Sequence, residues 1–297
     1  MADFRVKTKS SLLDYLTDIG HTRTKIKQLL RHRAIGVNGK AVKSLNHFLL
    51  KGDTVSISKD KKELNVIPPM GIKVIYEDND LIVIEKPSGL LSIASETEKI
   101  KTAYYQLNEF LRLRAPEAGE RIFIVHRLDR DTSGLIVFAK NEKVKCELQG
   151  RWKEVEKRYY AIVEGTPVKK EGDIESRLKE TKSLMVYSDR HSVVDSTLRE
   201  EAKLSKTKYR VLKRGREYSL LDIQLVTGRK NQIRVHLADI GHPVAGDKKY
   251  GAKTNPFSCL GLHAYLLSFK HPVTGKPLRF ESKMPGKFGP VVKSIGT

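Results

Sequence analysis

A nine-residue polar stretch, HRLDRDTSG from His126 to Gly134, interrupts an apolar part of the sequence. Five of its nine residues have side chains that ionise, whereas the segments on either side are apolar and typical of buried strands. Two carboxylates flanked by two arginines favour perturbed pKa values, which are common at catalytic sites. A solvated turn is the alternative, but a simple hairpin needs fewer residues. The stretch therefore predicts catalytic side chains held between two core strands.

Two later stretches contain single residues that could take part in the same chemistry. Tyr159 lies in KRYYAIVEG, where the residue pattern alone favours an ordinary aromatic side chain of a buried strand. Arg229 and Arg234 lie in TGRKNQIRVH. An arginine there could pair with a carboxylate, or it could be an exposed helix arginine that binds phosphate.

In this order, the three stretches closely resemble the motifs of the RluA-type pseudouridine synthases. HRLD followed by TSGL resembles the catalytic motif, which implies that Asp129 is the essential aspartate and gives Asp131 no catalytic role. The resemblance also implies that Tyr159 packs on the target base. It implies that Arg234, rather than Arg229, pairs with the aspartate. Arg127 and Arg229 are then expected to bind RNA.

The resemblance extends over nearly the whole chain, with two departures. Asn231 replaces the usual histidine, and LSIA at residues 91–94 replaces a more usual V-x-H-P ending. Conversion of uridine to pseudouridine involves no redox change and no donated group, so no cofactor is expected. The sequence agrees, because no G-x-G-x-x-G follows a strand and the histidines show no zinc-ligand spacing with the two cysteines.

These residue types suit the reaction that the resemblance implies. A carboxylate closed off from water tends to protonate, because burial disfavours charge. An arginine that pairs with Asp129 through two parallel hydrogen bonds would oppose this effect and orient the acid. Unstacking the uridine costs roughly a few kcal/mol, and stacking on an aromatic ring such as that of Tyr159 would return about 1–3 kcal/mol.

The strands and helices that must position these residues do not alternate regularly along the sequence. This order predicts an α+β fold with a mainly antiparallel, mixed sheet. The resemblance implies that this is the pseudouridine synthase fold. Helices are expected at 103–114, 143–153 and 231–240, the last ended by Gly241 in the left-handed conformation. Strands are expected at 73–76, 80–85, 122–126, 135–139, 158–164, 207–212 and 218–226.

A separate small domain is predicted at residues 1–60, before a linker at 61–70 and a catalytic domain at 71–297. Apolar stripes predict helices at 11–20 and 22–33, and Asn38-Gly39 predicts the turn of a hairpin at 34–42, followed by a strand at 54–58. Residues 10–58 resemble the small RNA-binding domain shared with the fourth ribosomal protein of the small subunit. The basic residues expected to lie on the RNA backbone are Arg23, Lys25, Lys27 and Arg31. A solvated helix face is the alternative.

The charge of the chain points to a polyanionic partner. The 56 Lys and Arg residues exceed the 35 Asp and Glu residues, for a formal net charge of +21. No apolar run is long enough to span a bilayer, and the first ten residues contain no signal-peptide core. Two cysteines are too few for a disulfide framework, so a reducing cytoplasm is expected. We expect a monomer whose partner is structured RNA. Ribosomal RNA of the large subunit is the first candidate substrate, and transfer RNA is the second.

Three other functions compete with an RNA pseudouridine synthase. A non-catalytic RNA-binding or ribosome-assembly protein explains the charge but leaves the three ordered motifs unexplained. A glycosidase would need a second carboxylate as its acid or base. A protein kinase would need a glycine-rich loop before HRLD and a DFG after it, and the sequence has neither.

Overall fold

The computed structural model describes residues 2–31, 35–42, 44–57, 70–114, 119–181, 185–189 and 202–295. The chain forms two compact units, residues 1–66 and residues 67–297. Within the described ranges, no helix combines the length and the apolar character needed to cross a membrane.

The N-terminal unit packs two helices against short strands. The helices are α1 (Leu12–Asp18) and α2 (Arg23–Arg31). Four strands pair in the order β1-β6-β3-β4, and β2 pairs with β5. The strands are β1 (Ala2–Arg5), β2 (Ser10–Ser11), β3 (Ile35–Val37), β4 (Lys40–Ala41), β5 (Phe48–Leu49) and β6 (Thr54–Ile57).

Local signals explain the ends of these elements. Ser11 is the N-cap of α1, and its hydroxyl accepts a hydrogen bond from the Asp14 amide. Asn38 and Gly39 both have positive φ, at 50° and 78°, as the predicted hairpin turn requires. Leu12, Leu16 and other aliphatic side chains from both helices and the strands form one buried core, so the unit has a hydrophobic centre of its own.

One large sheet organises the C-terminal unit. Among the described residues its order is β13-β12-β14-β15-β11-β16-β10-β8-β7, with β17 on β16 and β9 on β10. The strands are β7 (Lys73–Glu77), β8 (Leu81–Lys86), β9 (Phe123–Ile124), β10 (Ser133–Ala139), β11 (Glu156–Glu164), β12 (Glu171–Glu180), β13 (Val186–Ser188), β14 (Lys203–Arg214), β15 (Tyr218–Leu225), β16 (Leu262–Lys270) and β17 (Pro277–Glu281). The predicted α+β fold with a mainly antiparallel, mixed sheet is confirmed.

A parallel seam joins the two halves of this sheet. The named strand pairs are antiparallel except that of β10 with β16, where Ser133 pairs with His263 and Gly134 with Ala264. Gly134 has a φ of +117°, and a Cβ atom there would lie 2.2 Å from the Ala264 carbonyl oxygen. Only glycine permits this backbone approach. The seam is therefore short and tightly packed.

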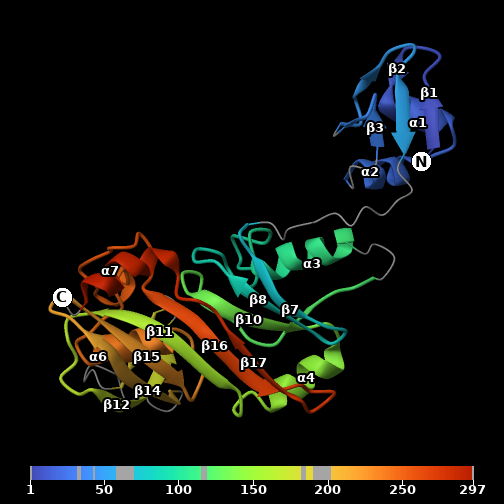
Figure 1. The fold of residues 1–297 in the computed structure, drawn as a ribbon. Coiled ribbons are helices and arrows are strands. Elements are labelled where there is room, and N and C mark those ends of the chain that lie inside the picture. Colours follow the sequence, from blue (N-terminus) through green and yellow to red (C-terminus); the bar gives the residue numbers. More distant parts are fainter. Residues whose placement is uncertain are drawn as a thin grey trace. The chain divides into compact units, whose positions relative to one another are not determined.

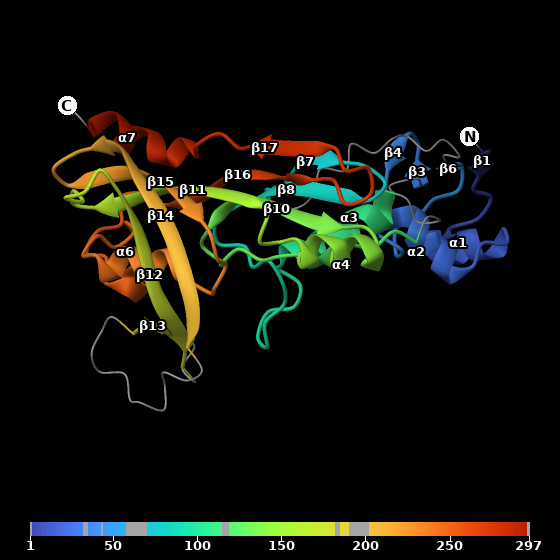
Figure 2. The same cartoon turned by 90° about the horizontal axis from the view of Figure 1, so that it is seen from below.

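Helices cover both faces of the sheet. They are α3 (Ala103–Arg114), α4 (Glu142–Gly150), α6 (Gln232–Asp239) and α7 (Gly289–Ser294), with short 3₁₀ turns at Lys248–Tyr250 and Gly286–Phe288. Figures 1 and 2 show α6 and α7 on opposite faces of the part of the sheet that contains β11 and β15. Along β11, Ile162 packs in the cluster of Phe288 on one face. Since strand side chains alternate, Tyr159 points to the other face, toward α6.

The structure differs from the prediction in several boundaries. The strand expected at 122–126 is only Phe123–Ile124, because the chain leaves β10 at His126, whose Nε2 accepts the Val137 amide instead. The helix expected at 143–153 begins at Glu142 after the N-cap Asn141 and ends at Gly150. Elements β1, β2, β5, β12, β13, β16, β17 and α7 were not predicted.

Candidate active site

Asp129 lies on the connection between β9 and β10, one residue after the buried Leu128. The connection folds as a turn in which the Asp129 carbonyl accepts the Thr132 amide at 3.3 Å. The side chain of Asp129 is 28% exposed, so the carboxylate is largely enclosed but still reachable from solvent. Asp131, by contrast, is exposed.

The segment after β8 holds this turn by its backbone. The Ser92 hydroxyl donates to the Leu128 carbonyl at 2.7 Å and accepts the Leu128 amide at 3.0 Å. The Ser88 hydroxyl donates to the carbonyl of Asp131. The buried Lys86 ammonium donates to the Arg130 carbonyl and to two carbonyls of its own segment. The LSIA departure therefore falls on a segment that positions the turn, and Ser92 belongs to it.

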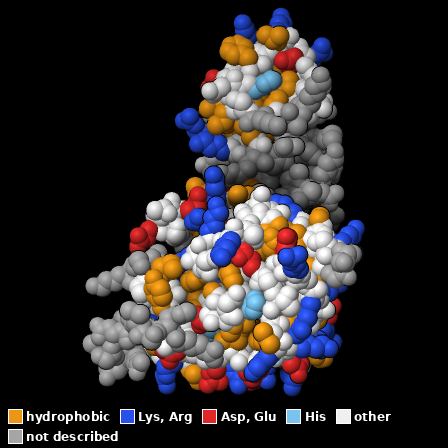
Figure 3. Space-filling view, turned by 90° about the vertical axis from the view of Figure 1, so that its left-hand side faces the viewer, with side chains coloured by type: hydrophobic (Ala, Val, Ile, Leu, Met, Phe, Trp, Pro, Cys, Tyr) orange, Lys and Arg blue, Asp and Glu red, His pale blue; other side chains and the backbone are white. Residues whose placement is uncertain are grey.

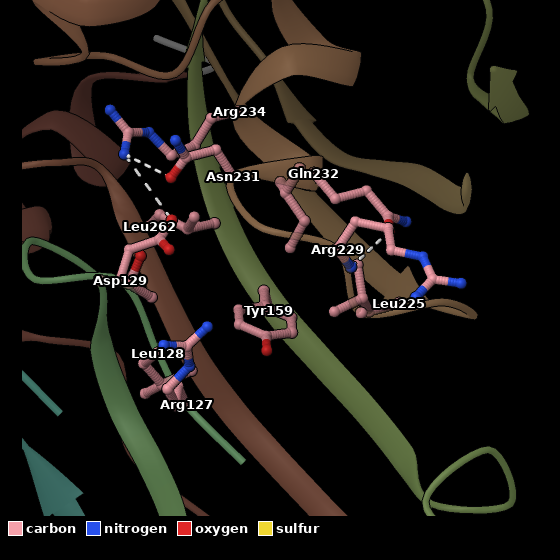
Figure 4. Close-up of a pocket in the computed structure, with 13 residues that line it drawn as sticks. Arg127, Leu128, Asp129, Tyr159, Leu225, Arg229, Asn231, Gln232, Arg234 and Leu262 are labelled. Carbon is pink, nitrogen blue, oxygen red and sulfur yellow. Dashed lines mark hydrogen bonds and ion pairs between the residues drawn. The ribbon is translucent and has the colours of Figure 1, made fainter. Parts of the chain in front are cut away.

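Side chains from four parts of the sequence meet at one pocket beside this turn (Figure 4). The pocket is open to solvent. Five of the residues predicted from the sequence line it: Arg127, Asp129, Tyr159, Arg229 and Arg234. The buried Thr132 also lines it, and its hydroxyl has no hydrogen-bond partner among the described residues.

Tyr159 forms the apolar floor of the pocket together with Leu225, Ile233 and Leu262. It stands on β11 at an irregularity, where the register between β11 and β16 shifts between Arg158 and Tyr159. Burial, and then the charge of Asp129, raise the pKa of the Tyr159 hydroxyl. The hydroxyl therefore stays protonated at neutral pH, and Tyr159 offers a ring and a neutral polar group.

Arg234, rather than Arg229, is the arginine beside Asp129. The Nη1 atom of Arg234 lies 3.7 Å from Oδ2 of Asp129. Figure 4 shows the Arg229 guanidinium on the opposite side of the pocket. Gln232 fixes the backbone that carries Arg229, because its side-chain oxygen accepts the Arg229 amide and the Thr227 hydroxyl.

The expectation of two parallel hydrogen bonds from Arg234 to Asp129 is wrong. Arg234 makes that two-pronged contact with Asp247, from Nε to Oδ2 and from Nη2 to Oδ1, both at 2.6 Å. With Nε and Nη2 occupied, only Nη1 faces Asp129. Asp247 ends the run GHPVAGD at residues 241–247, and nothing in its spacing distinguishes Asp247 as the partner of this arginine.

Opposing influences act on the Asp129 carboxyl. Its pKa is raised above the usual range, chiefly by burial, while the nearby Arg234 cation lowers it, the Asp247 charge raises it and Lys86 lowers it. Burial also lowers the pKa of Lys86 to about 7, although Asp131 and Asp129 favour its charged form. The site thus holds a carboxylate whose proton affinity depends on its charged neighbours.

The other predicted RNA-binding residues lie in the N-terminal unit. Arg23, Lys25 and Lys27 are exposed on α2, whereas Ile26 between them is buried in the core. The side chain of Arg31 lies outside the described residues. On the face in Figure 3, basic side chains of the C-terminal unit alternate with acidic and apolar ones.

Asp78, Asp80 and His271 are close enough to one another to hold a metal ion. Their hydrogen bonds explain the cluster without one. His271 Nδ1 accepts the amides of Val273 and Thr274, so Nε2 carries the proton and donates to Asp78 at 3.0 Å. The Tyr76 hydroxyl donates to the same carboxylate. The cluster therefore joins the ends of β7 and β16.

Residues 80–239 match the family model described as RNA pseudouridylate synthase. The protein named "Uncharacterized RNA pseudouridine synthase YlyB" of Bacillus subtilis is 34% identical over 285 residues, covering 94% of this chain and 91% of that protein. "Ribosomal large subunit pseudouridine synthase D" of Vibrio cholerae is 32% identical over 286 residues, covering 89% and 84%.

Two solved human structures are similar in fold. "Human RNA Pseudouridylate Synthase Domain Containing 1" superposes with a TM-score of 0.56 at 27% identity, covering 72% of this chain and 84% of that one. "Human RNA Pseudouridylate Synthase Domain Containing 4" superposes with a TM-score of 0.61 at 24% identity, covering 75% and 92%.

Proposed function

The chain belongs to the RNA pseudouridylate synthase family, and on that premise we propose that Asp129 is the carboxylate with which this RNA pseudouridine synthase isomerises uridine. The observation that carries the proposal is the enclosed Asp129 carboxylate, 3.7 Å from a buried guanidinium and in a pocket floored by Tyr159. Among the described residues that line the pocket, Asp129 is the one acid, which fits a mechanism with a single carboxylate.

The reaction rearranges bonds within one nucleotide. Asp129 in its ionised form starts cleavage of the bond between ribose C1′ and uracil N1. The base turns, C1′ joins C5, the C5 proton leaves to solvent and N1 gains a proton. Atoms and charge balance without a cofactor, so the residues of the pocket supply binding, orientation and the reactive carboxylate.

Each neighbouring side chain has a role in this scheme. The Tyr159 ring packs on the flipped-out base, a contact that contributes about 1–3 kcal/mol per base in comparable sites. Arg234 keeps Asp129 ionised and orients it, since an opposite charge at this distance favours the charged form of an acid. Arg127 and Arg229, which also line the pocket, bind RNA.

We further propose that the substrate is ribosomal RNA of the large subunit, with transfer RNA second. Relatives named for large-subunit pseudouridine synthesis support this choice. Residues 1–60 then act as an RNA-binding domain that adds affinity through α2, and residues 71–297 as the catalytic domain. The exposure of Arg23, Lys25 and Lys27 suits contacts with phosphates, which position a protein without reading sequence.

Paired substitutions of the two acids in the turn test the proposal. Asp129→Asn is nearly isosteric and removes the charge, so it should fold, bind RNA and release no tritium from RNA labelled at uracil C5. Asp131→Asn is the matched control on the exposed side of the same turn and should keep most of the activity. Turnover of Asp129→Asn near that of the wild type would refute the role of Asp129.

A further inference from the structure

The Arg234 guanidinium is held mainly by a carboxylate that does not face the pocket. Asp247 accepts two hydrogen bonds of 2.6 Å from it, whereas the nearest Asp129 oxygen lies 3.7 Å away. Both partners of the close pair are enclosed, because the side chain of Arg234 is 10% exposed and that of Asp247 is 1% exposed. Two-pronged pairs of this kind fix the plane of the guanidinium as well as its position.

The remaining sides of the guanidinium are also occupied. Asn231 Oδ1 accepts a hydrogen bond from Nη1 at 3.1 Å, and the Tyr250 ring lies 5.0 Å from the guanidinium carbon. The Tyr250 hydroxyl accepts a hydrogen bond from Asn231 Nδ2 at 2.9 Å. The orientation of Arg234 is therefore set by protein contacts, and Nη1 is the nitrogen that Asn231 and Asp129 share.

The backbone that carries Asp247 is itself rigid. The Asp247 carbonyl accepts the amides of Tyr250 and Ala252. Gly246 has a φ of +83°, and a Cβ atom there would lie 2.3 Å from the Cys259 carbonyl oxygen, so this backbone packs directly on its neighbour. A carboxylate on such a support can hold its partner in one geometry.

We propose that Asp247 is a positioning residue, which holds Arg234 with one nitrogen toward Asp129 and offsets part of the positive charge that Asp129 meets. The inference rests on the proposed role of Asp129. Without the Asp247 contact, Arg234 would turn toward the one carboxylate left beside it, and a two-pronged pair with Asp129 would form. That pair would bind the carboxylate that must react and would favour its ionised form more strongly.

The negative charge of Asp247 and its contact with Arg234 should affect different parts of the pH–rate profile. Asp247→Asn removes the negative charge that raises the pKa of Asp129. The acid limb of the single-turnover pH–rate profile, where the rate rises as Asp129 ionises, should therefore move to lower pH. The plateau should fall about tenfold or more, since about 1.4 kcal/mol of lost transition-state stabilisation corresponds to a factor of ten. RNA affinity should stay unchanged, because Asp247 is buried.

Two further variants separate positioning from simple support of the fold. Asp247→Glu keeps the charge but lengthens the side chain, so the acid limb should return to its wild-type position while the plateau stays low. Combining Asp247→Asn with Arg234→Met should lower the plateau little beyond Arg234→Met alone, because both changes act on the plateau through one arginine. Glu180→Gln removes an exposed acid paired with Lys230 near α6 and is the control that should change neither quantity.

The experiment uses the full chain and an unmodified transcript of large-subunit ribosomal RNA labelled at uracil C5. A wild-type profile for Asp247→Asn would overturn the inference, as would a loss of equal size at every pH that follows the fraction of unfolded protein. If Asp247→Asn does not fold, Asp247→Glu decides alone: a wild-type plateau overturns the inference. Activity of Asp129→Asn would instead refute the proposed function, so the two failures are distinct.

Discussion

Replacing Arg234 with methionine tests the electrostatics of the site most directly. Methionine keeps an unbranched, flexible stem and removes the cation that lies 3.7 Å from Asp129. It also leaves the buried Asp247 without its partner, so a negative charge near Asp129 is no longer offset. Both changes raise the pKa of Asp129, and the ionised form is then lost at a higher pH than in the wild type.

The size of the effect follows from the distance. Two unit charges 3.7 Å apart interact with about 4.5 kcal/mol at an effective dielectric constant of about 20, and with about 1 kcal/mol in bulk water. The Asp129 side chain is 28% exposed, so we take about 2 kcal/mol, which corresponds to a factor of about 30 in its ionisation equilibrium. On the acid limb the rate should fall by about that factor. It should recover as the pH rises.

The measurement is a pH–rate profile under single-turnover conditions. Arg229→Met is the matched control, because Arg229 lines the same pocket on its opposite side and should weaken RNA binding without moving the acid limb. Lysine at position 234 should rescue poorly, since a point charge cannot satisfy both oxygens of Asp247. The pairing of Arg234 with Asp129 would be refuted if Arg234→Met lowered the rate by the same factor at every pH while Arg229→Met shifted the acid limb.

Three further predictions concern other parts of the chain. Replacing the exposed Arg23, Lys25 and Lys27 of α2 with glutamine should lower the slope of log affinity against log salt by roughly 2, because each phosphate contact contributes about 0.7–0.9. An unchanged slope would show that α2 is only a solvated face. Ser92→Ala should cost about 1–3 kcal/mol of unfolding free energy in denaturant melts, because two buried Leu128 backbone groups lose their partner, whereas Ser88→Ala should cost less. Burial lowers the pKa of His263 to about 4, so the unfolded chain binds more protons between about pH 4 and 6.5, and the stability falls as the pH is lowered through that window. His263→Gln should flatten this dependence in thermal melts, and an equally steep curve would contradict it.

The sequence predicted the elements with strong local signals. Helix α3 has the expected bounds, because its apolar positions repeat with helical spacing, and Gly241 ends α6 with a φ of +81°. The Asn38-Gly39 turn follows in the same way from a residue pair that tolerates positive φ. Each of these features depends on residues that are close in the chain.

Features that depend on distant partners were missed. Strand β12 is exposed along one side, so its apolar residues are few, and it is a strand because β14 pairs with it. The choice of Asp247 as the partner of Arg234 depends on the loop packed against Cys259, which no local pattern encodes. Ser92 holds the turn that carries Asp129 from another segment of the chain. The proximity of Arg234 to Asp129 was thus predictable from the sequence, whereas the two-pronged contact of Arg234 with Asp247 was not.

The parallel seam between β10 and β16 also has a consequence for the order in which the site arises during synthesis. Strand β16 lies between β10, which follows Asp129, and β11, which carries Tyr159. A nascent chain that ends at Arg234 already contains the acid, the tyrosine and the arginine, but it lacks the strand that joins their two half-sheets. Long-range pairing forms only after its loop-closure entropy is overcome. The pocket can therefore close only after Leu262–Lys270 has left the ribosome, and shorter chains carry these three side chains without a closed pocket.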